Sequence, residues 1–407
     1  MAATGVPGAA APGAAAPSGP GAAASDVHGA AAVRSAAARL AEQLRCRGAE
    51  IERAGELPPD VVDALHAAGV FRLWLPVELG GYEATPAEVL EVVQVLAAAD
   101  ASTGWCAATG LASNIAGGLL SEPVARRIFH RPDVLCGGAL MPGGQAVRQP
   151  DGSYLVDGRW SFGSGIQHCD WVIGAARLVD DAAPDDPPRL LAVLMPAESV
   201  KFLQTWQVIG LEGTGSVDYE ASGLPVPAEH CIDLARLQPW PAGAMWRIPL
   251  RSLLYPVLAG VPLGIARRAL AELLTAADRV RYGSACRLAD RETVQATAGR
   301  VQALLGAGAS HLRDSLQRLY EVARTGQVPS PADRAAARGA AVYATELSLE
   351  AVTLCYQTVG TVALYRQHPL QRAVRDVLAA TQHFALSTQG FAIAGRVILG
   401  FEPDPML

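Results

Sequence analysis

The spacing of hydrophobic residues changes its period twice along this chain. Residues 31–133 carry apolar side chains at helical spacing, residues 134–232 form short glycine-bounded runs, and helical spacing returns from about residue 247. A period of 3.6 residues buries one face of a helix, whereas short apolar runs bounded by turn residues are typical of strands. The chain is therefore predicted to be an α+β protein in the order helical, β, helical.

Four segments are predicted from this pattern. We expect a disordered tail over 1–30, a helical domain over 31–133, an antiparallel β domain over 134–232 and a four-helix bundle over 245–401. The tail consists almost entirely of Ala, Gly, Pro and Ser, so it buries too little surface to offset the entropy cost of ordering. The last segment has long helical stretches separated by short breaks, which a four-helix bundle requires.

Composition excludes several classes of partner and site. A net charge of −6 over 407 residues leaves no surplus of cations to neutralise nucleic-acid phosphates. The seven cysteines are scattered and form no C-x-x-C pair, which argues against a zinc site or a disulfide framework and favours a reducing cytosol. No apolar run approaches the roughly 20 residues that cross a bilayer. We expect a cytoplasmic protein without a metal site, a membrane or a nucleic-acid partner.

The most specific motif lies in the β segment. The sequence GRWSFGSG occupies residues 158–165 and is followed by HCDW at 168–171. The chain contains no G-x-S-x-G elbow, H-E-x-x-H pair or Walker lysine. Taken with the order of the segments, these motifs make residues 35–400 resemble the acyl-CoA dehydrogenase superfamily, and within it the flavin-dependent monooxygenases that share the fold.

The resemblance implies a flavin site at the end of the GRWSFGSG strand. In the family this strand end passes the flavin ring, so Ser164 is expected to offer a hydroxyl or a backbone amide to the N5/O4 edge. Phe162 is expected to pack against the ring, and Trp160 and Gly165 to belong to the same cofactor site. The structural alternative is a glycine–serine turn between two strands.

Two more motifs imply residues of the substrate pocket. The sequence DASTGW at 100–105 opens a helix that lines the cavity in the family, which implies that Trp105 and Asn114 face the pocket. Ser216, in the loop 206–216, is implied to face the same cavity. For Trp105 a place in the helical core is the alternative. Glu212 stands in that loop where the family usually has arginine, which puts an anion-binding role for the loop in doubt.

A further motif, RVRYG at 279–283, resembles an element of the dehydrogenases in which arginine reaches the flavin pyrophosphate across a subunit interface. The resemblance implies that Arg279 and Tyr282 bind the cofactor, since a guanidinium can hold phosphate oxygens bidentately. It also implies a homo-oligomer, expected to be a tetramer built as a dimer of dimers. An exposed helical arginine is the alternative for Arg279.

The chemistry depends on the residues that come after Arg375-Asp376. Many dehydrogenases of the family place a glutamate base after this pair, but no acid occurs between residues 377 and 401. His383 instead matches the histidine of the monooxygenase branch. An imidazole can deprotonate or hydrogen-bond a phenol near neutral pH.

The resemblance as a whole implies a two-component monooxygenase. Such an enzyme takes reduced FAD or FMN from a separate NAD(P)H-dependent flavin reductase and hydroxylates a small aromatic substrate with O2. Ser164 and His383 are the expected catalytic residues. Three alternatives stay open: N- or S-oxygenation on the same scaffold, an acyl-CoA dehydrogenase with tightly bound FAD and Glu346 or Glu350 as base, and a non-catalytic relic of the fold.

Overall fold

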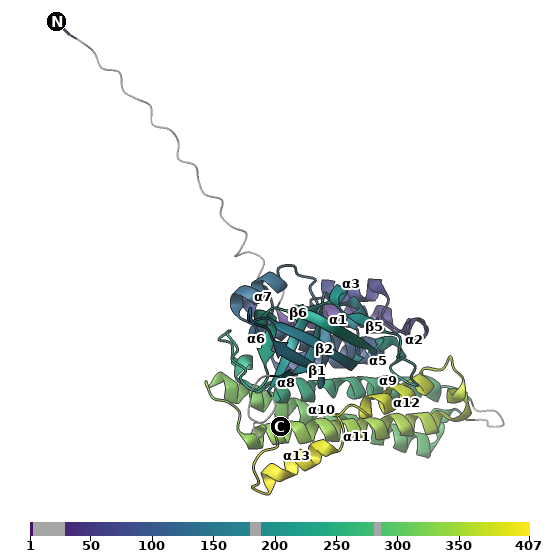
Figure 1. Cartoon of the computed structure of the whole chain (residues 1–407). Helices are drawn as coiled ribbons and strands as arrows, with labels where there is room; N and C mark the ends of the chain where they lie inside the picture. Colours follow the sequence, from purple (N-terminus) through teal and green to yellow (C-terminus); the bar gives the residue numbers. More distant parts are fainter. Residues whose placement is uncertain (3–28, 180–188, 281–285) are drawn as a thin grey trace.

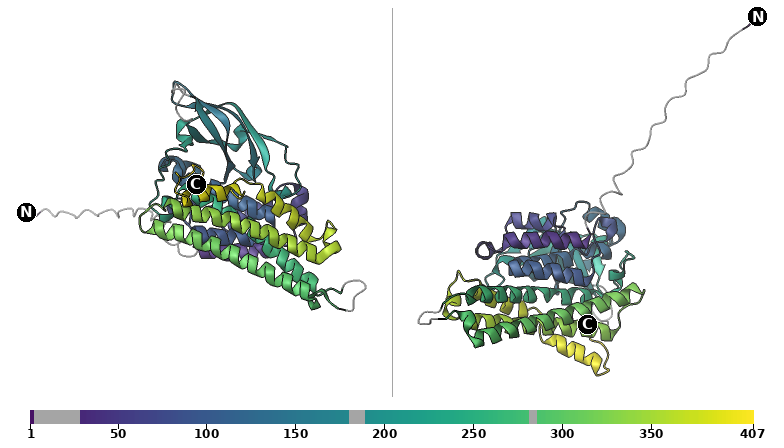
Figure 2. Two further views of the ribbon diagram at one scale, coloured as in Figure 1. Left: turned by 90° about the horizontal axis from the view of Figure 1, so that it is seen from below. Right: turned by 180° about the vertical axis from the view of Figure 1, so that it is seen from behind.

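The order helical, β, helical is confirmed by the computed structural model, which describes residues 1–2, 29–179, 189–280 and 286–407 (Figure 1). The tail expected over 1–30 therefore lies almost wholly outside the described residues. Figure 2 shows the sheet on one side of a stack of helices to which both helical segments contribute.

Among the described residues, seven α-helices precede the sheet: α1 (Ala30–Leu44), α2 (Gly48–Ala54), α3 (Pro59–Ala67), α4 (Pro86–Ala99), α5 (Ala101–Ser113), α6 (Ala116–Leu119) and α7 (Glu122–Ile128). Helix α5 begins where the Asp100 carboxylate accepts the backbone N–H of Thr103 at 2.8 Å. A carboxylate in this place satisfies one of the free N–H groups of the first turn and favours the helix start. The capping pattern seen in the sequence thus starts the helix that carries Trp105.

The sheet has seven strands in the order β5-β6-β2-β1-β3-β4-β7. Their bounds are β1 (Cys136–Arg148), β2 (Tyr154–Gly163), β3 (Trp171–Val179), β4 (Leu190–Pro196), β5 (Lys201–Leu203), β6 (Val217–Val226) and β7 (Cys231–Asp233). Every neighbouring pair is antiparallel except β1 and β3, which run parallel. The expectation of a purely antiparallel sheet is therefore wrong for one pair. Since β2 returns to the start of β1, β3 begins beside Cys136 and runs in the same direction as β1.

After the sheet, the described part of the chain forms six α-helices: α8 (Leu250–Leu258), α9 (Gly260–Ala277), α10 (Glu292–Arg324), α11 (Pro331–Val359), α12 (Pro369–Thr381) and α13 (Gln389–Ile398). Helices α9 to α12 pack on one another as the expected bundle, with α8 and α13 added against α11. Helix α9 also packs against α4, which joins the bundle to the first helical segment.

One segment of the described chain, Pro331–Leu364, is long and apolar enough to cross a membrane by length and composition. It contains α11, which packs against five other helices of the bundle (α8, α9, α10, α12 and α13). This is the position of a core helix, and the small side chains of α11 allow its neighbours to approach closely.

Trp160 lies inside the β domain, and the expectation that it contacts a cofactor is wrong. Its indole is 1% exposed, its Nε1–H donates to the carbonyl of Ala175 at 2.7 Å, and its ring stacks on Tyr219 with centroids 5.3 Å apart. A Cβ added at Gly174 would come within 2.5 Å of the indole, so the sheet is closely packed around it. No face of the ring is left for a ligand.

We therefore expect Trp160→Phe to lower the free energy of unfolding by about 2–4 kcal/mol, because it leaves a cavity and an unpaired carbonyl. Urea denaturation followed by circular dichroism measures the change. Trp171→Phe is the control, since this indole is partly exposed at the start of β3, and it should cost less than about 1 kcal/mol. Equal losses in both variants would contradict the assignment of Trp160 to the core.

Candidate active site

The indole of Trp105 holds the two expected catalytic residues in one place. Its Nε1–H donates to Ser164 Oγ at 3.0 Å, and its ring meets the imidazole of His383 edge-on with centroids 5.4 Å apart. Trp105 comes from α5, Ser164 from the turn after β2, and His383 from the turn after α12. Three segments far apart in the sequence thus form one site.

A row of hydroxyl groups continues from Ser164 into the protein. Ser164 Oγ lies 2.7 Å from Ser216 Oγ, which lies 2.7 Å from Thr214 Oγ1. Thr214 Oγ1 donates in turn to the carbonyl of Leu211 at 2.7 Å. Ser216 and Thr214 are buried and Ser164 is partly exposed. Ser216 is expected to face the cavity, but it is buried and reaches the site only through its contact with Ser164. Thr214 was missed because a T-G-S sequence does not reveal which side chains the loop turns inward.

The loop that carries these hydroxyls is bent by two left-handed residues. Leu211 has φ 53° and Gly215 has φ 51°, and the turn Glu212–Thr214 lies between them. A left-handed leucine costs on the order of 1 kcal/mol. Its N–H donates to Asp376 Oδ1 on α12 at 2.7 Å, which holds the strained residue in place. Burial raises the pKa of Asp376 to about 7, although this N–H favours the charged form.

Glu212 forms an ion pair where the family usually has arginine. Arg375 on α12 donates to Glu212 Oε1 at 3.0 Å, to the carbonyl of Ile209 at 2.9 Å and to Glu52 on α2. Burial and the charge of Glu52 raise the pKa of Glu212, against the opposite effect of Arg375. One arginine therefore joins both helical segments to the β domain, and Glu212 balances its charge.

His383 has the properties of a neutral hydrogen-bond donor. Its Nδ1 accepts the backbone N–H of Ala385 at 3.2 Å, so a neutral ring carries its proton on Nε2. Burial, and secondly the charge of Arg338, lower the pKa of His383 to about 4. Arg338 is fixed nearby because it donates to the carbonyls of Phe384, at 3.0 Å, and Ala385. Of the two roles expected for His383, this geometry favours hydrogen bonding over removal of a phenol proton.

Phe162 presents an unusual aromatic face beside Ser164. Its φ of 65° lies in the left-handed region, and its side chain is 71% exposed. The edge of its ring meets Trp206 at 6.4 Å and 89°. Strained residues of this kind gather at ligand sites. A flat apolar surface next to a hydroxyl suits an isoalloxazine ring, which has an apolar face and a polar edge, so the residues present fit a flavin.

Besides Trp160, two of the expected residues lie away from this site, and a further one is not described. Asn114 is fully buried, where its side chain donates to the carbonyl of Phe71 at 2.9 Å and accepts the N–H of Cys136 at 2.8 Å. The expectation that Asn114 faces the pocket is wrong, because its amide joins three backbone segments. Arg279 is exposed just past the end of α9, and Tyr282 lies outside the described residues.

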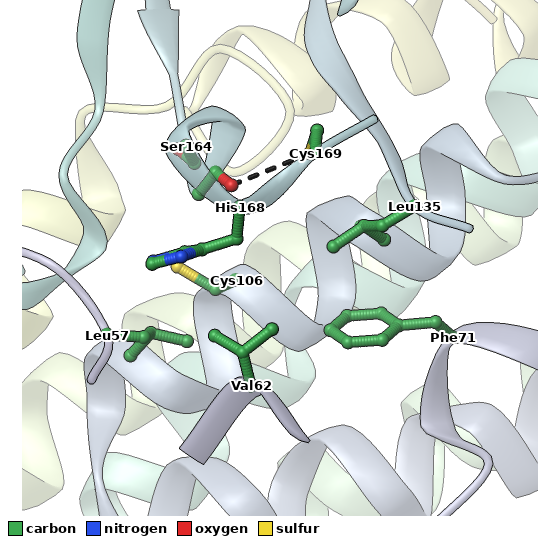
Figure 3. Close-up of a pocket in the computed structure, with 10 residues that line it drawn as sticks. Leu57, Val62, Phe71, Cys106, Leu135, Ser164, His168 and Cys169 are labelled. Atoms are coloured by element: carbon green, nitrogen blue, oxygen red, sulfur yellow. Dashed lines mark hydrogen bonds between the residues drawn. The ribbon is translucent and has the colours of Figure 1, made fainter. Parts of the chain in front are cut away.

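A small cavity lies behind the turn that contains Ser164 and Gly165 (Figure 3). It measures about 10 Å³ and its walls are mainly carbon and sulfur from Leu57, Val62, Phe71, Cys106, Leu135 and Cys169. His168 also borders it, and burial lowers the pKa of this histidine. The cavity is the size of one water molecule, so no aromatic compound fits there. Ser164 itself is partly exposed, as is the ring of Phe162 two residues before it.

Known proteins resemble this chain along most of its length. Residues 29–122 match the family described as acyl-CoA dehydrogenase, N-terminal domain, and residues 256–388 match acyl-CoA dehydrogenase, C-terminal domain. The indole-3-acetate monooxygenase of Pseudomonas putida is 30% identical over 363 residues, which are 89% of this chain and 92% of that protein.

Two further proteins carry cofactor information in their names. The FADH(2)-dependent resorcinol hydroxylase, oxygenase component, of a Rhizobium species is 29% identical and covers 90% of this chain and 93% of its own length. The structure of XiaF from a Streptomyces species in complex with FADH2 and glycerol has a TM-score of 0.84 and 26% identity. It covers 93% of this chain and 98% of its own chain.

We expect the imidazole of His383 to stay neutral, with its proton on Nε2, down to about pH 4. Nitrogen NMR of protein labelled in its histidines measures this, and His383→Gln identifies the signal. The folded pKa lies below the unfolded value of 6.5, so the unfolded state binds more protons and His383 lowers stability as pH falls from about 6.5 to 4. Titration near pH 6.5, or a proton on Nδ1, would contradict this assignment.

Proposed function

Because the chain belongs to the acyl-CoA dehydrogenase family, we propose that this site binds reduced FAD or FMN and hydroxylates a small aromatic compound with O2. The relatives named above are monooxygenases and hydroxylases, and the chain is an enzyme of this flavin-dependent kind. The observation that carries the proposal is the single indole of Trp105 in contact with both Ser164 and His383.

Each side chain has a task that its geometry supports. Reduced flavin, when bound, supplies the electrons that activate O2. Phe162 would offer its exposed ring to the flat face of the cofactor, and Ser164 and Gly165 would hold its polar edge. His383 donates from Nε2 toward the substrate or the bound oxygen, and Trp105 fixes the distance between His383 and Ser164.

The dehydrogenase alternative lacks a base in this structure. Glu346 is exposed on α11, and Glu350 is paired with Arg300 at 2.5 Å on the bundle surface. Neither carboxylate is buried beside Trp105, and no acid occurs after α12 before Glu402. A thioester α-proton has no acceptor among the described residues of the site, which favours oxygen chemistry.

The partners form part of the proposal. Relatives named as the oxygenase component of a hydroxylase support a separate NAD(P)H-dependent flavin reductase. We propose a cytoplasmic homo-oligomer, expected to be a tetramer, in which Arg279 and Tyr282 reach the flavin phosphates of a neighbouring subunit. Exposed apolar side chains near the end of α13 support further association: Ile398, Leu399 and Phe401 are 82%, 74% and 60% exposed.

The test of this function supplies reduced flavin from a flavin reductase, ¹⁸O₂ and a panel of phenols and indoles. A product that carries one ¹⁸O atom supports the proposal, and His383→Ala should lower the product formed per reduced flavin by roughly tenfold or more. A protein that binds no flavin, or that reduces its flavin with an acyl thioester, would overturn it.

We also expect Phe162→Gly to bind flavin more weakly while the protein becomes no less stable. Glycine relieves the left-handed strain, worth about 1 kcal/mol, and an exposed ring contributes little to folding. Loss of the aromatic face should raise the Kd of reduced flavin by roughly tenfold. Anaerobic titration and urea denaturation measure the two effects. Phe162→Leu is the control: it should weaken binding with no gain in stability, and unchanged binding in both variants would contradict the role of Phe162.

A further inference from the structure

The row of hydroxyl groups behind Ser164 has a fixed direction. A carbonyl oxygen only accepts hydrogen bonds, so Thr214 donates its single hydroxyl hydrogen to Leu211, 2.7 Å away. Thr214 Oγ1 can then only accept from its other neighbour. Ser216, at 2.7 Å, must therefore donate its hydrogen to Thr214.

The same constraint extends to Ser164. The hydrogen of Ser216 is used on Thr214, so across the 2.7 Å contact Ser164 must donate to Ser216. The indole N–H of Trp105 donates into Ser164 Oγ at 3.0 Å. A hydroxyl has one hydrogen and two lone pairs. Ser164 is thus left with one free lone pair and no free hydrogen.

The backbone beside Ser164 also lacks a free donor. The N–H of Ser164 donates to the carbonyl of Phe162 at 2.9 Å, and the N–H of Gly165 donates to the carbonyl of Thr214 at 2.9 Å. Thr214 and Ser216 are 1% and 4% exposed, whereas Ser164 is partly exposed. A ligand that reaches this turn therefore meets an acceptor, which differs from the expectation that Ser164 donates.

We propose that this row of hydroxyls selects the oxidation state of the flavin, with Thr214 and Ser216 as positioning residues that make Ser164 an acceptor. The inference rests on the proposed function and on the expectation, from the family resemblance, that Ser164 lies at the N5 edge. Reduced isoalloxazine carries a hydrogen on N5, whereas oxidised isoalloxazine has a lone pair there. Ser164 would accept a hydrogen bond from the N5–H group of the reduced form. With the oxidised form, the lone pair of Ser164 would face the lone pair of N5, and the two would repel each other.

The strength of the preference for reduced flavin is set by the hydrogen bond from Thr214 to Leu211, because this bond fixes the direction of the row. Reversal of the row would let Ser164 donate to oxidised flavin, but it would remove the hydrogen bond from Thr214 to Leu211. Since one such bond contributes a factor of about five to ten to an equilibrium, the preference for reduced flavin that arises here has the same size. Leu211 cannot turn its carbonyl away, because Asp376 holds its N–H at 2.7 Å.

Thr214→Val tests the inference, because it removes the end of the row and keeps the shape of the side chain. Anaerobic titrations give the Kd of oxidised and of reduced flavin for each variant. The Kd of oxidised flavin divided by the Kd of reduced flavin should fall about five- to tenfold in Thr214→Val. It should fall as much in Ser216→Ala, because that change frees the hydrogen of Ser164. Thr214→Ser keeps the hydroxyl and should keep the ratio of the unaltered protein.

Thr345→Val is the matched control. Thr345 is likewise 1% exposed and donates to a backbone carbonyl, that of Ala341 at 2.9 Å, but it lies within α11. Its substitution should leave the ratio unchanged. A second readout uses 5-deazaflavin, in which carbon replaces N5. The unaltered protein should bind reduced flavin more tightly than reduced 5-deazaflavin, and Thr214→Val should keep most of this difference, because Ser164 can still accept the hydrogen of N5.

Two results would overturn the inference, and they are distinguishable. Folded Thr214→Val and Ser216→Ala proteins with an unchanged ratio would show that the hydroxyl row does not select the oxidation state, while the proposed function would stand. An unaltered protein that binds neither form of flavin would remove the proposed function itself, and the inference with it.

Discussion

One of the hydrogen bonds between α12 and the β domain sets the direction of the hydroxyl row at the site. Asp376 accepts the N–H of Leu211 at 2.7 Å, and Leu211 turns its carbonyl toward Thr214 because it is held in the left-handed region. The same helix ends at Thr381, two residues before His383. Helix α12 therefore positions both catalytic candidates, Ser164 through a row of hydrogen bonds and His383 through the chain itself.

The positive charge of Arg375 beside this contact is balanced by two carboxylates. Arg375 on α12 bonds Glu52 of the first helical segment and Glu212 of the β domain, so all three parts of the chain meet at one guanidinium. Asp376 lies next along the helix, buried, and has a raised pKa because burial disfavours its charged form. An arginine in place of Glu212 would put two cations side by side here. The ion pair with Arg375 thus accounts for a glutamate at position 212, where the family usually has arginine.

Sequence motifs predicted three residues that lie together in the structure, but they could not say which way each side chain points. Ser164, Trp105 and His383 lie together as their motifs indicated. Trp160 and Phe162, two residues apart, belong on one face of a regular strand, yet the positive φ of Phe162 ends that alternation, so Trp160 points into the core and Phe162 into solvent. Non-local contacts were equally out of reach: the parallel pairing of β1 with β3, the burial of Asn114 and the inward turn of Thr214 depend on segments that meet only in the folded chain.

A two-component oxygenase must capture reduced flavin from one protein and later give up oxidised flavin. A Ser164 hydroxyl without a free hydrogen serves both steps. If Ser164 carried a free hydrogen, the site would hold the oxidised cofactor and slow its exchange. The row of hydroxyls ends at the carbonyl of Leu211, which cannot donate a hydrogen bond. The direction of every hydrogen bond in the row is therefore fixed, and Ser164 keeps no free hydrogen. The preference for reduced flavin comes from the backbone oxygen of Leu211, which α12 holds in place. It therefore depends on the docking of the β domain on the bundle as much as on Ser164, the residue that touches the ligand.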